Sequence, residues 1–211
     1  MNDATTARTG AWWYVVSRWL EYEGEIRVAV LRVFCVAAFY GAQLLHYLIY
    51  SDHSDIQQSF HRQATYLSAV WLFVSLAVLV MLSRQWLPAA LKYVTVTTDL
   101  LLLTATAALG SGPSSPMVFA FALLIALAAL RGNLPLLWFA TLGSMIGYMV
   151  LIGLNDEHWF DSIHRTPPVE QAVVLISLGA VGIVLGQLLR MLRQVSEEML
   201  ARHDSLTEQQ S

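Results

Sequence analysis

The chain has 211 residues, of which 56% are hydrophobic and 13% are charged, and its mean hydropathy is +0.55. A soluble globular domain carries about 25% charged residues, so this composition indicates an integral membrane protein instead. The net charge of −3 gives no basic excess of the kind that nucleic-acid-binding proteins show. The single cysteine, Cys35, excludes an intrachain disulfide.

The N-terminal segment 1–27 combines Trp12, Trp13 and Trp19 with charges of both signs. This mixture is typical of a helix lying at the inner headgroup level of a membrane. A frayed tail anchored by its aromatic residues is the alternative. Residues 28–193 follow as the predicted transmembrane domain, and 194–211 as a cytoplasmic tail.

Six stretches are apolar and close to the roughly 20 helical residues that cross a bilayer core of about 30 Å. They cover 28–50, 64–83, 88–109, 116–130, 135–154 and 169–193. In lipid, backbone polar groups must be paired within their own segment, which favours helices. Prolines stand at or near four of the starts, where a missing N–H costs little. We therefore predict an all-α polytopic fold with six transmembrane helices.

The distribution of Lys and Arg predicts the orientation of these spans. With the N-terminus inside, ten of the twelve basic residues fall on the cytoplasmic side, and only Arg62 and Arg165 fall outside. This count treats Arg32 as cytoplasmic. We predict that both termini lie in the cytoplasm.

Five of the six histidines fall on the predicted outer side or at the outer end of the first span, among carboxylates. Imidazole and carboxylate groups suit a divalent metal such as zinc, and histidine also suits a proton sensor. No pair has the i, i+4 spacing of a ligating helix, so solvated loops remain an alternative. The candidate metal ligands are His53, His61, His158 and His164.

Asp99 lies near the middle of the third span, where a charge costs about 3 kcal/mol on insertion scales. It must be protonated or paired there, with neighbouring threonine hydroxyls or Lys92 as the expected partners. The site is either a ligand or proton site or a polar clasp between helices. His46, which shares a helix face with Gln43, is a further sensing candidate.

Residues 110–119, GSGPSSPMVF, form a neutral turn between the third and fourth spans. Gly110 and Gly112 permit torsions that other residues resist, and the prolines restrict the turn. Two small-residue pairs, Gly143 with Gly147 and Gly182 with Gly186, favour close packing of helices within the chain, and contacts between two copies are the alternative.

The stretch TTDLLLLTATAALGSGPSSPMVFAFALLIALAAL resembles the membrane sensor domain of bacterial histidine kinases of the RegB/PrrB and PilS types. Input halves of some class III nucleotide cyclases and membrane-bound Ser/Thr kinases are similar. The resemblance covers roughly residues 27–200. Its motifs, which make up most of the ligand-sensing candidates, are Asp99 with Leu100, Gly110 with Gly112, and Ser115 with Pro116 and Met117.

The resemblance implies a dimeric input module of a bacterial inner membrane, fused or bound to a cytoplasmic kinase or cyclase. In the redox-responsive kinases this turn is implicated in quinone sensing, with a Gly-Gly pair and Asn-Pro-Phe. This chain has Gly-Ser-Gly and Ser-Pro-Met instead. Quinone and a divalent metal are the two candidate cofactors.

The last span runs into LLRMLRQVSEEMLARHDSLTEQQS without Gly or Pro. Leu188, Leu192, Val195 and Met199 follow three- and four-residue steps, which is typical of a short heptad seam. A dimeric signalling helix and a solvated amphipathic tail both fit this pattern.

We expect a sensor or transducer module rather than an enzyme. His203 follows the last span too closely to be a phosphoacceptor, and no ATP-binding or cyclase region accompanies it. A stand-alone module and a receptor fragment both fit. The alternative is a small transporter or channel-like protein with Asp99 in its path, and a membrane metalloenzyme is a third class.

Overall fold

The computed structural model describes residues 3–50, 55–84, 88, 90–110, 112–155 and 167–209. Within these ranges the chain is helical and contains no strand. The elements are α1 (Asp3–Tyr50), α2 (Asp55–Ser83), α3 (Leu91–Leu109), the 3₁₀ turns η1 (Gly112–Ser114) and η2 (Pro116–Val118), α4 (Phe119–Leu130), α5 (Leu134–Asn155) and α6 (Pro168–Gln209).

Four helices contain a stretch that is long and apolar enough to cross a membrane. These stretches are Glu23–Ile49, Gln58–Ser83, Leu134–Leu154 and Pro168–Ser196. The segment Pro116–Leu130 is apolar but shorter, and α3, which carries Lys92 and Asp99, is not among the four. The described part of this membrane protein is thus all-helical, with four candidate spans, and the count of six spans stays a prediction.

Large apolar side chains on the outside of the bundle fit a lipid surrounding. Phe34, Phe73 and Phe119 are 69, 73 and 81% exposed. A protein with such a surface would tend to aggregate in water, whereas the acyl chains of a bilayer solvate it.

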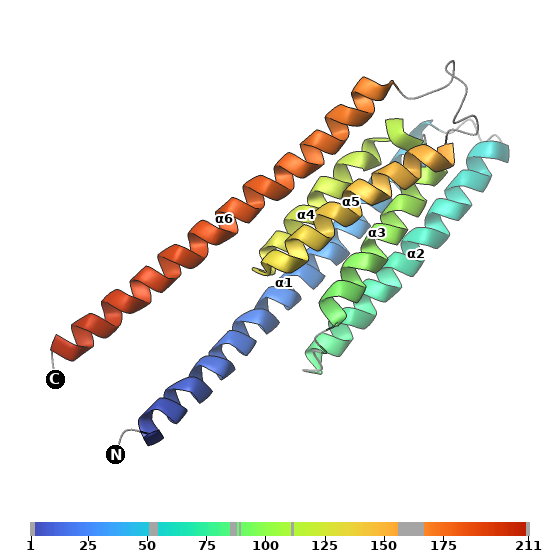
Figure 1. The fold of residues 1–211 in the computed structure, drawn as a ribbon. Coiled ribbons are helices and arrows are strands. Elements are labelled where there is room, and N and C mark those ends of the chain that lie inside the picture. Colours follow the sequence, from blue (N-terminus) through green and yellow to red (C-terminus); the bar gives the residue numbers. More distant parts are fainter. Residues whose placement is uncertain are drawn as a thin grey trace.

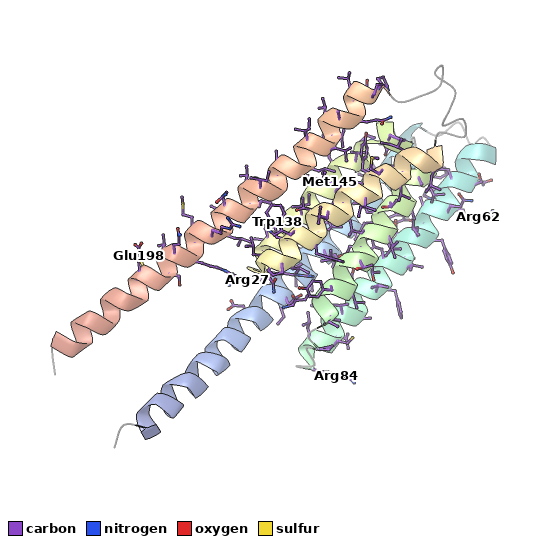
Figure 2. The ribbon with its side chains drawn as sticks, viewed as in Figure 1. Arg27, Arg62, Arg84, Trp138, Met145 and Glu198 are labelled. Atoms are coloured by element: carbon purple, nitrogen blue, oxygen red, sulfur yellow. The ribbon has the colours of Figure 1, made fainter. Side chains whose placement is uncertain are left out.

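The helices run alternately up and down the bundle (Figure 1). The N-terminal end of α1 and the C-terminal end of α6 extend past the bundle at the same end (Figure 1). Arg84 and Arg62 lie toward opposite ends of α2, with Arg84 toward the end from which the termini extend (Figure 2). α1 pairs with α2, while α5 packs against α3, α4 and α6.

Two helices are longer than a membrane span. α1 is continuous from Asp3 to Tyr50, so it includes most of the N-terminal segment 1–27. α6 is continuous from Pro168 to Gln209 and leaves the bundle without a break, as the lack of Gly and Pro after Gly186 predicted. It therefore joins the last candidate span to the tail as one helix.

The main apolar core lies among α3, α4, α5 and α6. Its fully buried side chains include Leu103 on α3, Phe121 on α4 and Tyr148 on α5. Small residues let these helices approach closely: Gly143 faces Leu100, Gly147 faces Thr104 and Phe121, and Gly182 faces Thr141. Gly186 also lies close to α5 side chains. Both predicted small-residue pairs thus pack within the chain.

Gly182 and Gly179 offer a matched test of this packing, since both lie on α6. A Cβ at Gly182 would lie 2.5 Å from the Cγ2 and Oγ1 atoms of Thr141, whereas nothing lies within 4 Å at Gly179. Thr141 is 2% exposed and its hydroxyl donates to the Leu137 carbonyl at 2.9 Å, so its side chain has little room to turn.

We expect Gly182→Ala to lower the free energy of unfolding by about 1–3 kcal/mol, as overpacking does. Gly179→Ala should leave it unchanged or raise it slightly, because alanine favours helix. Reversible unfolding in detergent micelles measures both. Equal stability of the two variants would contradict this packing of α6 on α5.

Candidate functional site

An ion pair between α1 and α3 lies at the centre of the candidate site. Arg32 Nη1 lies 3.2 Å from Asp99 Oδ2 and 3.4 Å from Oδ1, and the two side chains are 3% and 9% exposed. Trp71 on α2 donates its indole N–H to Asp99 Oδ1 at 2.9 Å. Asp99 therefore joins three helices through its carboxylate.

The partners of Asp99 differ from those predicted. The hydroxyls of Thr95, Thr97, Thr98, Thr104 and Thr106 each donate to a carbonyl three or four residues earlier in α3. They are satisfied within their own helix, as threonine often is in helices. Lys92 is not the partner either, because Arg32 holds this place. The count of basic residues by side assumed that Arg32 lies at the cytoplasmic end of the first span. Arg32 lies inside the candidate span Glu23–Ile49 instead.

A second buried ion pair ties α1 to the turn between α4 and α5. Arg131 Nε lies 3.2 Å from Glu25 Oε2, and the side chains are 5% and 9% exposed. Arg131 also donates to the Lys92 carbonyl at 3.0 Å and to Thr95 Oγ1 at 3.1 Å. It thus connects α1, the first turns of α3 and the α4–α5 turn.

The same turn contacts α6. Arg193 Nη2 donates to the Gly132 carbonyl at 2.6 Å. Gly132 has φ +64°, a left-handed conformation that favours glycine. Another residue at this position would be strained. Arg131 and Gly132, which are adjacent, therefore link the buried polar contacts of α1 and α3 to α6.

One cavity lies at the Arg32–Asp99 pair, and a second, larger one lies next to it. The smaller, of about 40 Å³, is lined by Arg32, Asp99 and Cys35 together with apolar side chains of α1, α3 and α4. The larger, of about 600 Å³, lies between α1, α2 and the turn that follows α3. Val36, Phe39 and Trp71 line both cavities, so only side chains separate them.

The predicted outer-turn residues line the larger cavity in part. Gly110, Ser115 and Pro116 line it, and Ser115 caps η2 by accepting a hydrogen bond from the Met117 N–H at 3.2 Å. Gly112 adopts φ +60°, whereas Gly110 has an ordinary negative φ of −83°. A torsion that favours glycine is thus confirmed at Gly112, whereas the expectation was wrong for the φ of Gly110. Gly112 is not among the residues that line either cavity.

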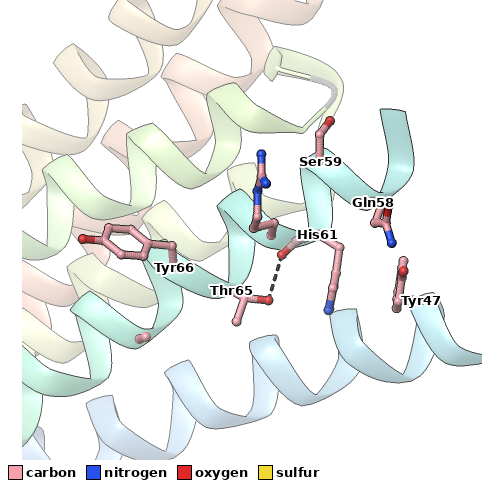
Figure 3. A pocket seen from close by; sticks show the side chains of 8 residues that line it. Tyr47, Gln58, Ser59, His61, Thr65 and Tyr66 are labelled. Atoms are coloured by element: carbon pink, nitrogen blue, oxygen red, sulfur yellow. Dashed lines mark hydrogen bonds between the residues drawn. The ribbon is translucent and has the colours of Figure 1, made fainter. Parts of the chain in front are cut away.

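His61 lies within α2 and not in an outer loop, since the helix begins at Asp55. Its ring stacks on Tyr47 with centroids 4.0 Å apart, beside an open groove of about 910 Å³ (Figure 3). His53, His158 and His164, and the side chain of His46, lie outside the described residues. Among the described residues no three His, Cys, Asp or Glu side chains converge on one point. The metal hypothesis stays untested.

The heptad residues of α6 face away from the bundle. Leu188, Leu192, Val195 and Met199 are each about half exposed or more. They form one stripe along the helix because their three- and four-residue steps match its period.

No family model matches the chain, and no curated protein or solved structure shows detectable similarity to it.

The buried pair predicts a strong and local effect of removing one charge. Arg32→Met should lower the free energy of unfolding in micelles by about 3–5 kcal/mol, because Asp99 would stay buried without its partner. Arg27 is the control, since its side chain is 73% exposed and pairs with Glu23 on the helix surface. Arg27→Met should change stability by less than about 1 kcal/mol. Similar losses in both variants would contradict a special role of the buried pair.

Proposed function

We propose that this chain is a sensor or transducer module of the bacterial inner membrane, with six spans and both termini in the cytoplasm. It would receive a signal at its outer face or within the bundle and pass it through α6 to a kinase or cyclase output domain, either fused or separate. The observation that carries this proposal is the contact between the α4–α5 turn and α6, in which Arg193 donates to the Gly132 carbonyl.

That contact completes a continuous set of interactions. Trp71 forms a wall of both cavities and donates to Asp99. α3 carries Asp99 and, nearer its start, Thr95, which accepts from Arg131. Gly132, the next residue, accepts from Arg193 on α6. A change at the cavity therefore has a physical route to α6 through side chains that contact one another.

α6 supports the output side of the proposal. A rigid helix that continues beyond the last candidate span can transmit a shift or rotation over its length. The exposed stripe of Leu188, Leu192, Val195 and Met199 fits a partner helix of a second copy. The common end of the two termini and the bias of Lys and Arg support an even number of spans.

The alternative is a small transporter or channel-like protein with Asp99 in its path. It has less support, because both oxygens of Asp99 already accept hydrogen bonds, from Arg32 and Trp71. A transported ion would have to displace these donors.

Dimerisation through α6 is tested by disulfide crosslinking in membranes. In a Cys35→Ser background, a cysteine at Val195 or Met199 should crosslink two copies, because these positions share the exposed stripe. A cysteine at Arg190, on the opposite side of the helix, is the matched control. Crosslinking that is absent at both stripe positions, or equal at Arg190, would contradict the dimeric transducer.

Coupling from the site to α6 is tested in the same assay. We expect Asp99→Asn, in protein that remains folded, to change the ratio of crosslinking at Val195 to that at Met199, because the link between α1, α2 and α3 is weakened. Arg27→Gln should leave this ratio unchanged. An Asp99→Asn ratio equal to that of the unaltered protein would leave Asp99 a structural clasp and contradict its role in signalling.

A further inference from the structure

Arg32 uses only part of its hydrogen-bonding capacity. Its contacts to Asp99 are made by Nη1 alone, and Nε and Nη2 are buried without a hydrogen-bond partner among the described residues. Nε and Nη2 together form the side of a guanidinium that holds two acceptor oxygens, or one shared oxygen. A buried donor pair of this kind calls for an acceptor, and the described residues do not supply one.

The space beside Arg32 shows where such an acceptor would lie. Arg32 lines the smaller cavity, whose volume of about 40 Å³ suits a single small polar group. Beyond Val36, Phe39 and Trp71, the larger cavity of about 600 Å³ lies within the size range of small-molecule sites. The lining of the larger cavity is mainly apolar and includes the side chains of Phe60, Ala64 and Met117.

The position of the cavities favours a ligand that comes from the lipid. Phe39 lines both cavities and is 42% exposed. The larger cavity is partly open and not enclosed, so a ligand can enter it from the acyl chains around the bundle. A volume of this size holds one acyl chain and is too small for a two-chain phospholipid.

The charges near Arg32 restrict the head of the ligand. Arg32 with Asp99 and Arg131 with Glu25 form two buried pairs that are already neutral together. A further charge in this part of the bundle would be unpaired, which is unfavourable at low dielectric. The head should therefore offer an acceptor oxygen without a net charge.

We propose that this site binds a single-chain lipid with an uncharged carbonyl head, such as a protonated fatty acid. The chain occupies the larger cavity. Binding moves the side chains between the two cavities, Val36, Phe39 and Trp71, so that the carbonyl oxygen reaches Nε and Nη2 of Arg32. This inference rests on the proposed function in one respect only, since it identifies the ligand class of the proposed sensor. The head would lie beside Trp71 and Asp99, where the route to α6 begins.

The test is photolabelling of the full chain in membranes with palmitic acid that carries a diazirine on its chain. We expect saturable labelling of residues that line the larger cavity, read by mass spectrometry. Unlabelled palmitic acid and palmitamide should compete, because both bring a carbonyl oxygen. Hexadecane, which has no acceptor, should not.

Two variants and one control make the assignment specific. Arg32→Lys keeps the positive charge beside Asp99 and removes the two-donor edge, so the probe should bind about tenfold more weakly. Ala64→Leu fills the larger cavity, since Ala64 is 5% exposed and lines it, and should abolish saturable labelling with the ion pair intact. Arg27→Lys should label as the unaltered protein does. If Arg32→Lys does not fold, the Ala64→Leu variant decides.

Three results would overturn the proposal: no saturable labelling, which would leave Arg32 hydrated by water alone; equal competition by hexadecane; or labelling unchanged by Ala64→Leu. The outcome is separable from that of the proposed function. Labelling without crosslinking between α6 helices would overturn the transducer only, and crosslinking without labelling would overturn the lipid site only.

Discussion

The burial of two opposite charges, Arg32 and Asp99, constrains the arrangement of the helices more than any other interaction. Arg32 and Asp99 are almost fully buried in a bundle whose outer surface is apolar. Lipid offers neither charge an alternative partner, so each requires the other and α1 must lie at one height relative to α3. Trp71 extends this requirement to α2. The pair thus fixes the positions of α1, α2 and α3 relative to one another, although Arg32 and Asp99 are 67 residues apart in the sequence.

The bundle divides into two parts that are held together differently. α3, α4, α5 and α6 share the main apolar core and approach closely at Gly143, Gly147 and Gly182. The α1–α2 hairpin meets them through a small apolar cluster and through buried polar contacts, from Arg32, Trp71 and Glu25. The cavity at the pair and the larger one next to it both lie at this boundary. A boundary held by a few polar contacts next to cavities is better suited to a small shift than a close-packed core is.

Local sequence features predicted the helices well because each has a local cause. Pro116 and Pro168 begin helical segments as expected, and α6 continues from Leu188 to Gln209 without a break because no Gly or Pro lies in that stretch. The small-residue pairs indicated close packing for the same reason: a missing Cβ permits approach whatever the partner is. His61 was placed in a loop because its polar neighbours hid the start of α2 at Asp55.

The partner of Asp99 was missed because it depends on tertiary structure. Arg32 is 67 residues away, and counting basic residues by side treats every arginine near an inner end as a solvated charge. A signal was nevertheless present, since Arg32 stands within the apolar run VAVLRVFCVAAF, where an unpaired charge is unfavourable. One acidic and one basic residue inside predicted spans would have indicated a pair. The threonines of α3 misled because their hydroxyls bond to their own helix.

The most direct measurement is the coupling free energy between Arg32 and Asp99 in a double-mutant cycle in lipid bilayers. Arg32→Met, Asp99→Leu and the combined variant would be unfolded reversibly and compared with the unaltered protein. We expect the combined variant to be more stable than either single variant, with a coupling of at least about 2 kcal/mol. Losses that simply add would contradict a buried pair in which each charge exists to neutralise the other.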